Sequence, residues 1–470
     1  MRAARQHQRH RPESTPLHAV VRDHLETFLA AAREDHGKAL PRYVEAEMRA
    51  YLACGILAHG FLRARCNACG KDLLVAFSCK RRGACPSCNA RRMCGTAAHL
   101  VDHVVPAVPV RQWVLSVPFE LRLLLARNPR ALSAVGRIFV QEVARWQRDQ
   151  ADAAGVPWKR TRAGAICFPQ RFGGSLNLNV HFHVAVPDGV FTRAARSARA
   201  DFRRVRAPDR EDLDTVALNV SVRSLAWLRR RGLVLDEPPD TPEESGSALD
   251  ACLAASLGIG DVTALPAGRP GKGPTGAGPA RSGSRSGQDR GFDVHAGVVV
   301  EAHDRAGRER LFRYCARPPL SLERLAILPD GRIAYELRKP WGRATHRVMT
   351  PLQFLARLAA LIPPPRHPLI RFHGVFAPHS SWRKSVVPAQ APCRPPEAPI
   401  CDRTPAPQTE APRAGSRPAL GGTPCSTPGP ACVPRAEAAP SHAALLALRP
   451  PLPYIPWAEL LRRTHDVDAL

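Results

Sequence analysis

The chain has 470 residues, of which 68 are Lys or Arg and 41 are Asp or Glu, so its formal net charge is +27. This excess favours a polyanionic partner, and among these we expect DNA. No run of about 18 apolar residues occurs, which excludes a membrane-spanning helix, and the Arg-rich N-terminus lacks the apolar core of a signal peptide. We therefore expect a cytoplasmic, nucleoid-associated protein with neither a membrane nor a small-molecule partner.

The N-terminal third begins with a predicted disordered basic arm, residues 1–16. Apolar residues at helical spacing then predict a helix over 17–32. A second helix is expected over 41–55, because Pro41 is a residue favoured in the first turn of a helix. These helices open a unit that we place at 17–110.

The sequence contains 14 cysteines, and their spacing indicates metal binding rather than disulfides. Two C-x2-C pairs, Cys66/Cys69 and Cys85/Cys88, are separated by 15 residues. This spacing matches a four-thiolate zinc ribbon, in which each pair presents two sulfurs from one tight turn. We predict one structural Zn²⁺ at these four residues.

Other residues of the same block leave two matters open. A second metal site or ordinary core packing would equally explain the remaining metal-ligand types, which are Cys54, His59, Cys79 and Cys94. Between the two pairs lie Lys80, Arg81 and Arg82, and a metal-stiffened loop with these charges suits contact with phosphate. The unit 17–110 is thus predicted to bind zinc and to contact DNA.

Residues 177–191 alternate strictly between apolar and polar side chains, which predicts a strand with one face on the core. His181 and His183 fall on the same side, about 7 Å apart along the strand. This spacing lets both imidazoles reach one divalent cation. The alternative is a pair of polar residues on a solvated strand face. The turn residues 187–189 end the strand.

Neighbouring segments predict the remaining elements of a domain at 111–385. A strand over 164–172 is expected to pair antiparallel with the histidine strand, and the Gly-, Pro- and Ser-rich stretch 236–291 is a predicted flexible insert. The other predicted elements are strands at 110–118, 292–300, 325–328 and 332–337 and helices at 121–126, 131–146, 219–235 and 351–362. A Pro-rich disordered tail over 386–454 and a short helix over 455–470 complete the chain.

A turn at 304–307 and a short helix at 308–317 carry Tyr314, one of five tyrosines. Three arginines, Arg310, Arg313 and Arg317, surround it in the sequence. They are expected to bind a phosphate and, through their charge, to favour the phenolate form of the tyrosine. A core tyrosine held by hydrogen bonds is the alternative explanation.

Taken together, these motifs resemble the rolling-circle transposases of the ninety-one-type insertion-sequence family. The resemblance covers roughly residues 17–388. The residues that carry it are SCKRRGACPSC (78–88), NVHFHVAVPDGVF (179–191), RYCARPP (313–319), HGVFAP (373–378) and WAELLRR (457–463).

The resemblance implies an α+β chain, in which a helical zinc-ribbon-like domain precedes an antiparallel-sheet nuclease, with a disordered linker and tail. It implies cleavage of single-stranded or cruciform element ends. His181 and His183 would hold Mg²⁺ or Mn²⁺, and Tyr314 would attack the phosphate to leave a 5′-phosphotyrosine and a free 3′-OH. The strand could then be transferred without ATP.

The sequence also departs from the family pattern. Founding members have a second tyrosine four residues after the first, where this chain has Pro318, so we expect a single nucleophile. No further C-x2-C pair follows residue 463, and no third metal ligand is set by spacing. A degraded copy that only binds DNA through its zinc domain, and a plasmid rolling-circle replication initiator, are the alternative interpretations.

Overall fold

The structure is a computed structural model that describes residues 11–65, 70, 72–193, 199–234, 247–257, 262–263, 286–341 and 343–388. Most of these residues form one compact unit, and Arg65–Leu73 is assigned to a second unit. The first ten residues, most of the predicted insert, and the predicted tail and C-terminal helix from residue 389 on lie outside the described residues. Nowhere in the described part is a helix both long and apolar enough to cross a membrane.

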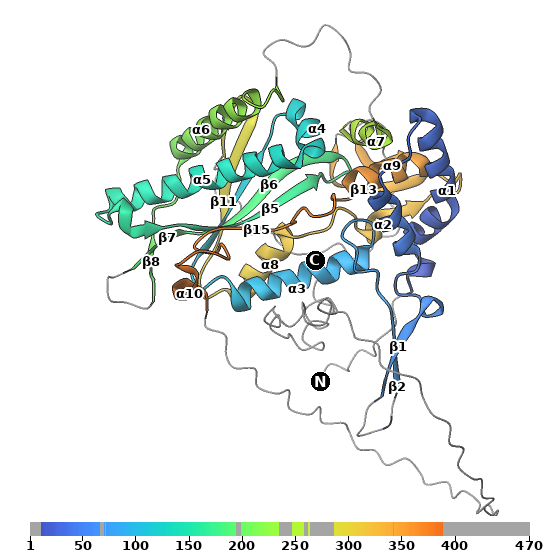
Figure 1. Ribbon diagram of the computed structural model, residues 1–470, viewed down its shortest axis with the longest axis horizontal. Coiled ribbons are helices and arrows are strands. Elements are labelled where there is room, and N and C mark those ends of the chain that lie inside the picture. The colour runs from blue at the N-terminus through green and yellow to red at the C-terminus, as the bar shows by residue number, and fades with distance from the viewer. Residues whose placement is uncertain are drawn as a thin grey trace, which may run out of the picture. The chain divides into compact units, whose positions relative to one another are not determined.

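An antiparallel sheet of six strands, in the order β10-β11-β3-β6-β5-β15, forms the centre of the main unit (Figure 1). The histidine strand β6 lies inside the sheet, and β5 pairs with it antiparallel, as predicted. The α+β class with an antiparallel sheet is therefore confirmed. The strands are β3 (Val110–Ser116), β5 (Gly164–Phe172), β6 (Leu178–Pro187), β10 (Ser286–Asp289), β11 (Phe292–Val300) and β15 (Arg371–Gly374).

Three helices cover the sheet face that bears Phe182 and the other even-numbered residues of β6. They are α4 (Phe119–Arg127), α5 (Pro129–Ala153) and α6 (Arg210–Arg229). Helix α5 approaches closely because Gly136 has no side chain, and a Cβ there would lie 2.8 Å from the Phe182 ring. Helix α6 starts nine residues earlier than the predicted 219, because Asp209 and Asp212 form a capping box.

The opposite sheet face, which bears His181 and His183, is covered by α3 (Pro86–His103) and α8 (Arg305–Cys315). A second apolar core lies there, with Ala97, Leu100, Val101, Phe168, Leu311, Phe312 and Cys315 among its members. Strand β6 is thus buried on both faces, and a solvated histidine face is excluded. The predicted turn at 304–307 is wrong, because Asp304 accepts a hydrogen bond from the Gly307 amide and caps the first turn of α8.

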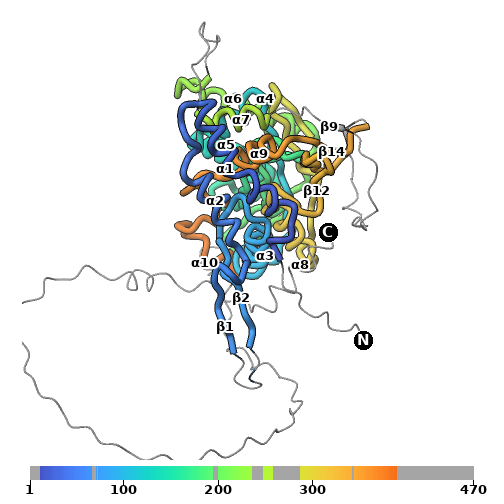
Figure 2. The backbone as a smooth tube through the Cα atoms, turned by 90° about the vertical axis from the view of Figure 1, so that its right-hand side faces the viewer, coloured from blue at the N-terminus to red at the C-terminus, as the bar shows by residue number. Residues whose placement is uncertain are grey.

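The N-terminal helices pack against helices from the far end of the chain. Helices α1 (Pro16–His36) and α2 (Arg42–Leu52) share one core with α7 (Ala248–Leu257) and α9 (Pro351–Leu361), and Figures 1 and 2 both show α1 beside α9. The predicted units 17–110 and 111–385 therefore pack as one body. Helix α7 and strand β10 fall within the predicted flexible insert 236–291, so that prediction is wrong for those residues.

Smaller sheets complete the fold. The predicted hairpin at 325–337 is confirmed by β12 and β13, which are joined by two further strands in one sheet. The remaining strands and the last helix are β1 (Phe61–Arg65), β2 (Asp72–Ala76), β4 (Thr161–Arg162), β7 (Gly189–Thr192), β8 (Asp201–Arg204), β9 (Val262–Thr263), β12 (Leu325–Ile327), β13 (Ile333–Trp341), β14 (Ala344–Met349) and α10 (Arg383–Val386).

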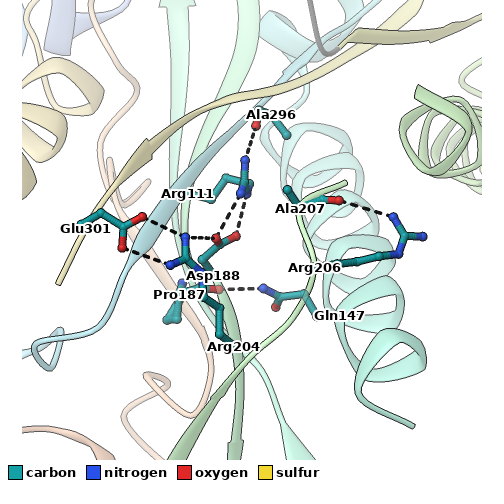
Figure 3. A network of polar contacts seen from close by, with 9 residues as sticks. All are labelled: Arg111, Gln147, Pro187, Asp188, Arg204, Arg206, Ala207, Ala296 and Glu301. Atoms are coloured by element: carbon teal, nitrogen blue, oxygen red, sulfur yellow. Dashed lines mark hydrogen bonds and ion pairs between the residues drawn. The ribbon is translucent and has the colours of Figure 1, made fainter. Parts of the chain in front are cut away.

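A buried ion pair fixes the end of the histidine strand (Figure 3). Asp188 accepts hydrogen bonds from Arg111 of β3 on both carboxylate oxygens, at 2.6 and 3.0 Å. Arg111 also donates to the Ala296 carbonyl of β11 at 2.9 Å, and Arg204 bridges Asp188 to Glu301. The network joins β3, β6, β8 and β11 beside the C-terminal end of β6.

Candidate active site and zinc site

The alternation of β6 directs His181 and His183 to the same side, against α8. Their Nε2 atoms lie 3.2 Å apart, and the two side chains are 7% and 4% exposed. Such convergence of two ring nitrogens is what a shared cation requires. The structure therefore brings the two predicted ligands together, while their role in metal binding stays a prediction.

Burial keeps both imidazoles neutral. It lowers the pKa of His183 to about 3, with further contributions from the charges of His181 and Arg338, and it also lowers the pKa of His181. The His181 Nδ1–H donates to the Asn179 carbonyl at 2.9 Å, which leaves Nε2 with its lone pair. The Nδ1 of His183 lies 2.8 Å from the side-chain amide nitrogen of Gln112. A cation needs the lone pair on Nε2, and His183 has it there when the amide turns its oxygen to accept the Nδ1–H.

Strand β5 offers a third ligand, an amide oxygen. Gln170 lies directly opposite His181 in the sheet, so its side chain is on the same face. Its amide nitrogen donates to the Cys315 carbonyl at 2.7 Å. Its Oε1 atom is buried and has no hydrogen-bond partner among the described residues. Two neutral imidazoles and an amide oxygen fit a divalent cation. No signal in the sequence identified Gln170, because a β-bulge between Gln170 and Phe172 shifts the register by one residue, and counting back from the turn would have placed Gln170 opposite Val180.

Helix α8 presents Tyr314 to the histidines. Its ring centroid lies 5.3 Å from that of His183, with the ring planes at 80°. Leu311 and Cys315 anchor the helix in the core, as predicted, and Tyr314 is 38% exposed. The phenol is therefore accessible to a bound molecule beside a buried pair of imidazoles, which is the arrangement a nucleophile needs.

The arginines around Tyr314 differ from the predicted set. The guanidinium carbons of Arg317 and Arg338 lie 4.9 and 5.3 Å from its ring centroid. The Nε of Arg317 is buried and has no hydrogen-bond partner among the described residues. The other two predicted arginines have carboxylate partners, because Arg313 pairs with Glu309 at 2.7 Å and Arg310 with Asp304 at 3.6 Å.

Sequence reasoning missed Arg338. It comes from β13, in a different sheet from the histidines, and no spacing in the sequence relates it to Tyr314. Its side chain is exposed, and no carboxylate is paired with it in the described part of the chain. Arg317 and Arg338 together give the tyrosine a strongly positive surrounding, suited to an anion.

A four-sulfur cluster lies at the start of α3. The Sγ atoms of Cys54, Cys79, Cys85 and Cys88 all lie within 4.8 Å of one another, and three of the pairs are 3.5 to 3.6 Å apart. A tetrahedral zinc–thiolate site has sulfurs about 3.8 Å apart, given Zn–S bonds of about 2.3 Å. The four residues therefore fit one structural Zn²⁺.

The cluster contains one C-x2-C pair of the predicted zinc site and two cysteines of the possible second site. Cys85 and Cys88 were predicted zinc ligands, and Cys54 and Cys79 complete the tetrahedron. The other predicted pair, Cys66 and Cys69, lies outside the described residues. Because four thiolates already saturate the site, the cluster needs no ligand from that pair.

The basic loop beside the cluster is only partly available to a ligand. Lys80 and Arg81 are exposed. Arg82 instead donates to the carbonyls of Pro364 and His367, both at 2.7 Å, and so joins the zinc loop to the segment after α9. Of the three residues in this loop that were predicted to contact phosphate, Arg82 is therefore occupied by hydrogen bonds within the protein.

Comparison with protein-family models gives two matches. Residues 20–117 match a model described as "Transposase zinc-binding domain", and residues 164–384 match one described as "Putative transposase". The first includes the four-sulfur cluster, and the second includes His181, His183 and Tyr314. The chain matches no curated protein and no solved structure.

Proposed function

Because this chain belongs to the ninety-one-type family of insertion-sequence transposases, we propose that it nicks single-stranded DNA at its element ends and transfers the strand through a 5′-phosphotyrosine on Tyr314. The observation that carries this proposal is the exposed Tyr314 ring, 5.3 Å from the ring of a buried, neutral His183. A transposase acts on DNA, so the excess of arginine has a ready purpose.

His181, His183 and Gln170 would hold a divalent cation, Mg²⁺ or Mn²⁺, through two Nε2 atoms and one amide oxygen. When bound, such a cation polarises a phosphate oxygen as a Lewis acid. The protein contributes by keeping both imidazoles neutral and by orienting them, through Asn179 for one ring and Gln112 for the other.

Tyr314 would act as the nucleophile. Its Oη forms a bond to the scissile phosphorus as the bond from phosphorus to the 3′ oxygen breaks, and the phenol proton ends on the departing 3′-OH. Arg317 and Arg338 would hold the non-bridging oxygens, where negative charge grows in the transition state. In the second step a new 3′-OH attacks the same phosphorus and releases the tyrosine, so no ATP is consumed.

One tyrosine per chain is sufficient for this scheme. Among the other tyrosines, Tyr335 is 1% exposed, and Tyr43 and Tyr51 belong to α2. Position 318, where a second nucleophile would stand, is proline. A second strand cleavage would therefore use Tyr314 again or a second copy of the chain.

The test is covalent trapping. Full-length protein with Mn²⁺ is incubated with single-stranded oligonucleotides from the element ends, and the digested product is mapped by mass spectrometry. We expect one adduct, on Tyr314 and at the 5′ end of the cleaved strand, and none with Tyr314→Phe. Tyr335→Phe is the matched control and should form the adduct normally. Adducts that persist in Tyr314→Phe would refute the assignment, and DNA binding without any adduct would favour the non-enzymatic alternative.

A further inference from the structure

We propose that the hollow between α5 and α6 is a second DNA site, which holds a short segment of single-stranded DNA. The hollow has a volume of about 450 Å³. Residues from both helices line it, among them Arg137, Ile138, Val222, Trp227 and Arg230. Its size lies in the range of sites that enclose a small ligand, about 300–1,000 Å³, and so suits a nucleotide unit.

The charge of the hollow favours phosphate. Arg137 of α5 and Arg230, which directly follows α6, are exposed, and neither has a carboxylate partner in the described part of the chain. The third arginine, Arg223, is already neutralised, because it pairs with Glu142 and also donates to Gln141 at 2.8 Å. The hollow therefore has two positive charges that no carboxylate of the described chain offsets, and a phosphodiester supplies the opposite charge.

Part of the lining of the hollow is apolar and aromatic, which favours a single strand over a duplex. Ile138, Val222, Ala226 and Trp227 line it, and Val222 is 45% exposed. The Arg231 guanidinium lies 5.3 Å from the centre of the Trp227 ring. Unpaired bases stack on such surfaces, whereas a duplex keeps the faces of its bases stacked on one another.

The hollow lies on the other side of the sheet from the tyrosine. Helix α5 packs on Phe182, whereas His181 and His183 point from the same strand toward α8. DNA in the hollow is therefore not the segment being cut at that moment. Between nicking and joining, a strand transferase must keep an uncut strand bound. That purpose rests on the proposed function, but the binding itself does not.

Binding can be tested without cleavage. Fluorescence anisotropy with labelled oligo(dT) and full-length protein, in buffer without added Mg²⁺ or Mn²⁺, gives the affinity across a salt series. We compare Arg137→Gln/Arg230→Gln with the control Arg145→Gln/Arg210→Gln, which removes two exposed arginines of α5 and α6 outside the hollow. Loss of two phosphate contacts should lower the slope of log K against log salt by about 1.4 and weaken binding at least fivefold relative to the control.

Stacking is tested separately. In Trp227→Leu this part of the lining stays apolar but the ring is lost, so binding should weaken while circular dichroism stays unchanged. Oligonucleotides with 5-iodo-deoxyuridine should crosslink to Trp227 on irradiation. Equal affinity and equal salt slope for the two double variants, or crosslinks that map only to other tryptophans, would overturn the proposal. Because none of these readouts uses Tyr314, they distinguish failure of this site from failure of the nuclease assignment.

Discussion

Asp188 is the acidic residue closest in sequence to the histidine pair, and we predict that it stabilises the fold and binds no metal. Its carboxylate and the Arg111 guanidinium are 2% and 4% exposed. Asp188→Asn keeps the size of the side chain but removes its charge, and it turns one of the two acceptors of Arg111 into a donor. The result is a buried guanidinium without its counter-ion (Figure 3).

The cost follows from this burial. Removing one partner of a buried ion pair lowers the free energy of unfolding by about 3–5 kcal/mol. The remaining Asn oxygen and the Ala296 carbonyl still accept from Arg111, so we expect about 3 kcal/mol for Asp188→Asn. Glu301 in the same network is 42% exposed and pairs with a half-exposed Arg204. Glu301→Gln should therefore cost less than about 1 kcal/mol.

The measurement is urea unfolding at pH 7 with zinc present, analysed by linear extrapolation. Nicking by the folded fraction of Asp188→Asn, well below its melting temperature, should need the same Mn²⁺ concentration as the wild type. A loss of stability no larger than that of Glu301→Gln would refute the reasoning. Wild-type stability combined with a raised Mn²⁺ requirement would instead make Asp188 a metal ligand.

Three further results are expected. Cys79→Ser should lose the bound Zn²⁺, measured by native mass spectrometry, because metal binding and folding are coupled; zinc retained in full would contradict the four-sulfur assignment. Arg338→Gln should lower kcat for nicking about 10²- to 10³-fold with little change in KM, whereas Lys339→Gln, its neighbour, should be nearly silent. Burial, with the charges of Arg371 and Arg137, lowers the pKa of His373 to about 4. In the unfolded chain the His pKa is near 6.5, so on acidification the unfolded chain binds a proton at this position before the folded chain does. The contribution of His373 to the free energy of unfolding should therefore fall by about 1–2 kcal/mol between pH 7 and pH 5. His373→Gln should remove that part of the pH dependence of unfolding.

The central strands could be predicted from the sequence because their signal is local. Strands β5 and β11 begin and end at the predicted residues. Strand β11 is rich in branched apolar residues and follows Gly291, and β5 is followed by Gly173 and Gly174. The alternation of apolar and polar residues in β6 gave the common direction of His181 and His183. Tyr314 was predicted because its helix follows a clear strand and carries two core anchors.

Features that depend on tertiary contacts could not be predicted. The sulfur tetrahedron draws Cys54 from the end of α2 and Cys79 from beyond the β1–β2 hairpin, whereas spacing alone pairs the two most regular C-x2-C motifs. Arg338 belongs to a different sheet from the histidines, and only tertiary packing brings its guanidinium close to the Tyr314 ring. The start of α6 was predicted too late for a different reason. Its capping box lies before the apolar stripe from which the helix was predicted.

From the position of α3 we predict that the zinc site affects nicking as well as folding. Cys85 directly precedes this helix and Cys88 lies in its first turn, so the sulfur cluster lies at its beginning. Twelve residues after Cys88, about 18 Å farther along at 1.5 Å per residue, Leu100 packs in the same core as Leu311 and Phe312 of α8. Helix α8 carries Tyr314, and a displacement of about 1 Å at a nucleophile can cost about 10²-fold in rate. Loss of zinc should therefore reduce nicking far more than it reduces DNA affinity, because arginines spread over the whole chain bind the backbone while a single packed helix aims the tyrosine.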